Sequence, residues 1–64
     1  MNLSISVQEE VREIVPQLQL GQHQQIGDTG LFVAHQTTEM DDSRFTLVSS
    51  LEIDGRTYNI YSAT

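Results

Sequence analysis

The dipeptide Asp54-Gly55 is the feature that most restricts how this chain can fold. It separates two runs rich in β-branched and aromatic residues, which favour strands. A two-residue type I′ turn needs two successive residues that tolerate positive φ, and Asp-Gly meets that need. The sequence therefore predicts a β-hairpin at the C-terminal end. The pairs expected across its strands are Ile53 with Arg56, Leu51 with Tyr58, Ser49 with Ile60, and Val48 with Tyr61.

An amphipathic helix is predicted near the N-terminus, from Ser6 to Val15. Ser6 and Glu9 match a capping box, and Glu9 and Glu10 would lie in the first turn, where the helix dipole favours negative charge. Pro16 disfavours helical geometry at the residue before it, so we expect the chain to leave the helix at Val15. The apolar residues that share one face of this helix are Val7, Val11, Ile14 and Val15.

Two short strands are expected between the helix and the hairpin. Residues 17–20 alternate polar and apolar side chains with the period of a half-buried strand, until Gly21 and the glutamine-rich stretch 22–25 interrupt them. After a turn-forming cluster at 27–30, residues 31–35 again have the composition of a strand.

These elements predict a single α+β domain over residues 1–64. One N-terminal helix would pack on a small, mainly antiparallel sheet of three to four strands that ends in the hairpin. The predicted core is Val7, Val11, Ile14, Leu18, Leu20, Leu31, Val33, Phe45, Leu47, Leu51, Ile53, Tyr58 and Ile60.

The small size of the chain suggests that it associates with another chain. A domain of 64 residues buries only roughly 60% of the surface that its unfolded chain exposes. The sequence contains no cysteine, so disulfides cannot add stability. Association is then the remaining common source of extra stability, and we expect a homodimer or a complex with another protein.

The charge balance restricts the classes of partner. Nine acidic residues stand against three arginines, with no lysine, and the net charge is −6. A field of this sign repels nucleic-acid backbones and anionic lipid surfaces, so we expect neither direct nucleic-acid binding nor membrane binding. A partner protein with a basic surface is favoured instead. The N-terminus lacks the pattern of a secretory signal, so a cytoplasmic location is expected.

The chain offers no pattern that is specific to an enzyme or a metal site. His23 and His35 stand twelve residues apart and lack the i, i+4 spacing of a helical zinc site, so both are interpreted as solvated polar residues. The acidic loop around Asp41 lacks the glycine and the late glutamate of a calcium-binding EF-hand. We therefore predict no catalytic residues, no metal and no cofactor.

Two groups of residues are the candidates for partner binding. The first is the acidic loop formed by Glu39, Asp41 and Asp42, whose carboxylates either serve solubility alone or imitate the phosphates of a nucleic acid. The second is an apolar patch on the sheet side opposite the helix, where the side chains break the polar alternation. An alternative is that Leu3 and Ile5 fold over this patch and cover it. The residues of the predicted patch are Phe32, Val48 and Tyr61.

The function predicted from these features is protein binding. The first hypothesis is a small acidic regulator or inhibitor of the kind carried by phages and mobile elements, which acts as a nucleic-acid mimic in the basic groove of a nucleic-acid-handling protein. The alternative is a structural or assembly subunit that acts by homo-oligomerisation or as a component of a larger complex. Salt separates the two hypotheses, because electrostatic steering weakens with ionic strength and apolar assembly does not.

Overall fold

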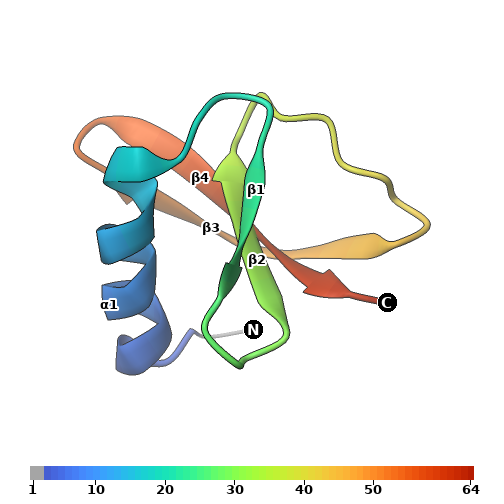
Figure 1. The fold of residues 1–64 in the computed structure, drawn as a ribbon, viewed down its shortest axis with the longest axis horizontal. Helices are drawn as coiled ribbons and strands as arrows, with labels where there is room; N and C mark the ends of the chain where they lie inside the picture. Colours follow the sequence, from blue (N-terminus) through green and yellow to red (C-terminus); the bar gives the residue numbers. More distant parts are fainter. Residues whose placement is uncertain (1–2) are drawn as a thin grey trace.

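The computed structural model describes residues 3–64 and contains one helix layer and one sheet layer (Figure 1). Helix α1 spans Ile5–Ile14, and a 3-10 turn, η1, follows at Val15–Gln17. The four strands form one antiparallel sheet in the order β1-β2-β4-β3, with α1 packed against one side. This arrangement confirms the predicted α+β fold. The strands are β1 (His23–Ile26), β2 (Leu31–His35), β3 (Phe45–Ile53) and β4 (Arg56–Ala63).

Helix α1 begins earlier than the sequence predicts. Its N-cap is Ser4, whose hydroxyl accepts a hydrogen bond from the amide of Val7 at 3.2 Å. Ser6 lies inside the helix, so the predicted capping box with Glu9 is wrong, and no acidic residue occupies the first turn. Ser4 and Ser6 both precede the apolar residues of the helix at a spacing that suits an N-cap. The packing of the helix on the sheet selects Ser4 as the cap.

The chain also stays helical beyond the predicted end at Val15. The α-helix stops at Ile14, but Val15 keeps helical dihedral angles (φ −61°, ψ −31°), and the amide of Leu18 bonds to the Val15 carbonyl at 3.2 Å. Pro16 fits this 3-10 turn because residues in the first turn of a helix need no intrahelical donor. The extra turn places Val15, which is 6% exposed, in the core.

Residues 17–20 do not form the predicted strand. Leu18 packs against the core, whereas Leu20 is 73% exposed. The carbonyl of Leu18 accepts a hydrogen bond from Nε2 of His35 at 2.9 Å, so this backbone bonds to a side chain rather than to a neighbouring strand. The first strand lies further on, within the glutamine-rich stretch, and it contributes the fully buried Ile26.

The core lies between α1 and the sheet. Most of the predicted core residues are buried or packed against this cluster, but Leu20, Phe45 and Leu47 are not part of it. Val15 and Ile26 are buried there without having been predicted. The buried members of the cluster are Val7, Val11, Val15, Ile26, Val33, Ile53, Tyr58 and Ile60.

The terminal hairpin is confirmed, with one change of register. Asp54 (φ 52°) and Gly55 (φ 79°) both have the positive φ of a type I′ turn. Three of the predicted pairs form, but the pair between Val48 and Tyr61 does not, because a β-bulge between Leu47 and Ser49 leaves Val48 unpaired. Tyr61 pairs with Leu47 instead, and Val48 packs against the core.

The position of the N-cap can be tested with two matched serine variants. Ser4→Ala should lower the free energy of unfolding by about 1 kcal/mol, because the amide of Val7 loses its acceptor. Ser6→Ala should change it by less than about 0.5 kcal/mol, because alanine is a good helix former at an interior position. Urea unfolding followed by circular dichroism measures both values. A larger loss for Ser6→Ala would contradict the assignment of the cap.

Candidate interaction surface

The side of the sheet that faces away from α1 carries a cluster of aromatic side chains. Successive residues of a strand point to opposite sides, so the neighbours of the core residues Val33 and Ile60 point away from the helix. Phe32 and Tyr61 are such neighbours, and they pair directly across β2 and β4. The surface is called the aromatic face below, and it consists of His23, Phe32, Phe45, Leu47 and Tyr61.

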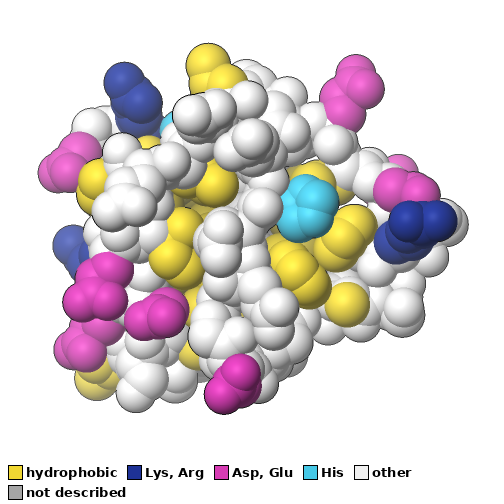
Figure 2. All heavy atoms as spheres, viewed as in Figure 1, with side chains coloured by type: hydrophobic (Ala, Val, Ile, Leu, Met, Phe, Trp, Pro, Cys, Tyr) yellow, Lys and Arg dark blue, Asp and Glu magenta, His cyan; other side chains and the backbone are white. Residues whose placement is uncertain are grey.

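The rings of the aromatic face pack against one another in edge-to-face or tilted geometry. The centroids of Phe32 and Phe45 are 5.3 Å apart with 79° between the ring planes. The His23 ring lies 5.7 Å from Phe32 and 5.2 Å from Phe45, and Phe45 also approaches Tyr61 at 6.5 Å. These separations are those of stabilising aromatic pairs, so the rings hold each other in place. Figure 2 shows hydrophobic side chains gathered around a histidine on the side away from α1.

The aromatic face is only partly covered by the rest of the chain. Tyr61 is buried, Phe32 and Phe45 are half-buried, and His23 is exposed. Leu47 is 56% exposed, which is a large fraction for an apolar side chain beside aromatic rings. The alternative that Leu3 and Ile5 cover this patch is wrong, because Leu3 packs against the core and Ile5 is 74% exposed.

A short polar network borders the rings. The hydroxyl of Ser50 donates to Oδ1 of Asn59 at 2.9 Å, and Nδ2 of Asn59 donates to the hydroxyl of Tyr61 at 3.2 Å. The network joins β3 to β4 and fixes the side chain of Asn59. The phenol hydrogen of Tyr61 is not used in these bonds and remains available as a donor.

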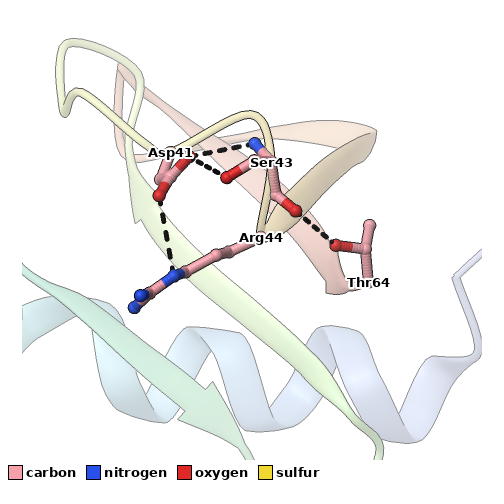
Figure 3. A network of polar contacts seen from close by, with 4 residues as sticks. All are labelled: Asp41, Ser43, Arg44 and Thr64. Carbon is pink, nitrogen blue, oxygen red and sulfur yellow. Dashed lines mark hydrogen bonds and ion pairs between the residues drawn. The ribbon is translucent and has the colours of Figure 1, made fainter.

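The acidic loop lies directly before β3 and leads into Phe45 of the aromatic face. Oδ1 of Asp41 accepts hydrogen bonds from the amide (2.9 Å) and the hydroxyl (2.6 Å) of Ser43 (Figure 3). Oδ2 of the same carboxylate faces Nε of Arg44 at 3.7 Å. The C-terminal Thr64 holds this turn, because its hydroxyl donates to the Ser43 carbonyl and its amide donates to that of Arg44. Glu39 and Asp42 are exposed in the same loop.

The hydrogen bonds from Ser43 lower the pKa of Asp41 below its ordinary value of 3.8. The side-chain bond contributes most and the backbone bond adds to it. Both donors stabilise the charged carboxylate, so the group stays ionised to lower pH than an isolated aspartate. The position of the Asp41 carboxylate is therefore defined, although the residue is exposed.

Local backbone hydrogen bonds join the acidic loop to the aromatic face. The backbone carbonyl of Asp41 accepts hydrogen bonds from the amides of Arg44 at 3.0 Å and Phe45 at 2.9 Å. The loop is thereby attached to the first residue of the aromatic strand β3. Of the predicted patch, Phe32 and Tyr61 lie together here, whereas Val48 faces the core.

The prediction from sequence missed three members of this face. His23 was placed in a loop, and Phe45 and Leu47 were placed in the core. The alternating pattern of β3 assigns both apolar residues to the helix side unless a bulge intervenes, and the sequence of β3 carries no signal for one. His35 also differs from its interpretation as solvated, because it is 6% exposed and bonded to Leu18.

A hollow of about 340 Å³ lies between α1 and β1, and its lining includes Glu10, Glu13 and His23. No group of three or more histidine, cysteine or acidic side chains in the described residues is placed to hold a metal ion. No helix in this part of the chain is long and apolar enough to cross a membrane.

The chain matches no protein-family model, no curated protein and no solved structure. Its function is therefore inferred from the residues and contacts of the aromatic face and the acidic loop.

The fixed carboxylate of Asp41 leads to a prediction about its titration. Ser43→Ala removes the hydroxyl bond and should raise the pKa of Asp41 toward 3.8, whereas Ser43→Thr keeps a hydroxyl and should leave the pKa low. Because the folded pKa is lowered, the bond stabilises the fold above the ordinary pKa, and this contribution is lost as the pH falls through the lowered value. An NMR titration of the Asp41 carboxyl carbon measures the shift. The same pKa in the parent and in Ser43→Ala would contradict the assignment.

Proposed function

We propose that this chain is a protein-binding regulator or inhibitor that docks on a basic surface of its partner. The observation that carries the proposal is the junction of the aromatic face with the acidic loop through Phe45 and Asp41. Aromatic side chains at the centre of a contact, surrounded by polar groups, are the usual composition of a strong binding site. The charges at the edge of such a site favour a partner of opposite sign and speed its approach.

The distribution of charge supports a basic partner. Arg44 and Asp41 form an ion pair, and it is the only one within residues 3–64. Within residues 3–64 the remaining eight of the nine carboxylates make no such contact, so the surface keeps a strong negative field. A basic groove that normally holds nucleic acid has the complementary charge. We therefore propose that the partner is a nucleic-acid-handling protein and that the carboxylates occupy the positions of nucleic-acid phosphates.

The acidic part of the proposal is tested with two triple variants of equal charge. Glu39→Gln with Asp41→Asn and Asp42→Asn should lower the association rate by about tenfold or more, because steering depends on charges near the contact. The control, with Glu9, Glu10 and Glu13 all changed to Gln, removes three charges from the helix layer and should have a smaller effect. The partner is isolated by affinity capture from a cell lysate, and stopped-flow kinetics with it at low salt measure both rates. Equal rates for the two variants would refute a local role for the loop.

The aromatic part is tested with two exposed leucines. Leu47, which is 56% exposed, belongs to the aromatic face, whereas Leu20, which is 73% exposed, lies in the turn after η1. Leu47→Ser should abolish or strongly weaken capture of the partner, and Leu20→Ser should leave it unchanged. Neither variant should unfold the protein, because each side chain is already largely in solvent. Equal capture by both variants would refute the proposal that this face makes the contact.

A second candidate function is assembly with further copies of the chain. Strand β3 is an outermost strand of nine residues, and its free edge can pair with another strand. The bulge at Val48 and the charge of Glu52 are features that protect such edges, so this candidate stands second.

Molecular mass across a dilution series separates the two functions. If assembly is the function, light scattering should show a dimer that dissociates on dilution, and Leu47→Ser should shift the equilibrium toward the monomer. High salt should not dissociate this dimer, because screening weakens charge contacts and not apolar ones. A parent chain that stays monomeric at millimolar concentration would exclude the assembly function.

A further inference from the structure

The aromatic face presents ring surfaces that suit a cation. In an edge-to-face pair the edge of one ring contacts one face of the other ring. The remaining ring faces are not used by the pair. Phe32 and Phe45 are half-buried, and each is thus partly open to a ligand. The face of a phenyl ring carries negative charge density and attracts cations. Because the rings already pack against each other, a ligand would not have to order them.

Asp41, whose backbone carbonyl bonds to the amide of Phe45, has one carboxylate oxygen that Ser43 does not hold. Ser43 holds Oδ1 of Asp41, while Oδ2 faces the guanidinium of Arg44. At 3.7 Å the contact to Arg44 is longer than a hydrogen bond, and the side chains are 80% (Arg44) and 55% (Asp41) exposed. Exposed ion pairs of this kind contribute little and exchange readily. Oδ2 can therefore accept a better-placed cation from a partner.

Rings next to a carboxylate favour a guanidinium over an ammonium group. A guanidinium is planar and weakly hydrated, so it stacks on an aromatic ring while its N–H groups bond to a carboxylate. An ammonium is compact and strongly hydrated, and it loses more by leaving water. A second copy of this chain is a poor source of the cation, because it carries the same net charge of −6.

We propose that the aromatic face receives an arginine from a basic segment of the partner, and that Arg44 occupies the place of that arginine at Asp41 in the free protein. This inference rests on the proposed protein-binding function and specifies the chemistry of the partner. Arg44 is then an internal competitor. Its removal strengthens binding of an arginine-containing segment, whereas removal of a distant arginine does so only through the change in net charge.

The probes that test this proposal are two eight-residue peptides, one alternating glycine with arginine and one alternating glycine with lysine. Each is titrated into the 15N-labelled protein and followed by NMR. The arginine peptide should bind roughly two- to fivefold more tightly, which is the value of one exposed cation–π contact that the strongly hydrated ammonium gives up by staying in water. Its largest shifts should fall on the amides of Asp41, Ser43, Phe45 and His23. Equal affinities, shifts confined to α1 or the hairpin, or no binding of either peptide at millimolar concentration would each overturn the proposal.

Two arginine variants separate the local effect from the change in net charge. Arg44→Gln and Arg56→Gln each change the net charge from −6 to −7, but Arg56 begins β4 beside the hairpin turn and makes no contact with Asp41. Arg44→Gln should strengthen binding of the arginine peptide at least twofold more than Arg56→Gln does. Equal gains would show that Arg44 does not compete for the site, and would overturn that part of the proposal.

Failure of the arginine-binding proposal can be distinguished from failure of the proposed protein-binding function. Suppose that the two peptides bind equally while Leu47→Ser still loses the partner and Leu20→Ser still keeps it. The aromatic face is then a protein-binding surface, and only its preference for arginine is refuted. If both leucine variants keep the partner, the proposed function fails whatever the peptides do.

Discussion

A single extra residue in β3 decides which side chains the sheet presents on each side. Side chains alternate along a strand, so a bulge reverses the assignment of every residue before it. The bulge between Leu47 and Ser49 turns Phe45 and Leu47 away from the helix and turns Val48 toward the core. Without it, Phe45 and Leu47 would point to the helix side, and Phe45 would not pack against Phe32 and His23.

The second constraint is that one helix can cover only one side of a sheet. The valines of α1 and η1 fill the core side, and the described chain has no second helix for the other. Aromatic rings on the uncovered side partly shelter one another, which limits the cost of their exposure to water. The proposed binding surface is thus compatible with a stable small domain, because its rings also pack among themselves.

The sequence predicted the elements of the fold better than their ends and connections. The hairpin followed from Asp54-Gly55, and the helix followed from the spacing of its valines, because both signals are local. The strand after the helix was misplaced because Gln17–Leu20 has the alternation of a strand. The Leu18 carbonyl in that segment bonds to the His35 side chain and not to a neighbouring strand. Within the candidate site, Phe32, Tyr61 and the acidic loop were predicted, whereas His23, Phe45 and Leu47 were not.

What the sequence by itself determined is the set of local conformations and the charge: a helix, a tight turn with positive φ, a strand at 31–35 and a net charge of −6. Only the tertiary structure decided which serine caps the helix, where the bulge falls and which side chains share a face. These choices depend on contacts between residues far apart in the chain, such as Phe32 with Phe45 and Leu18 with His35. Local propensity is nearly equal for the alternatives, so the packing of the sheet against α1 and of the rings against each other selects among them.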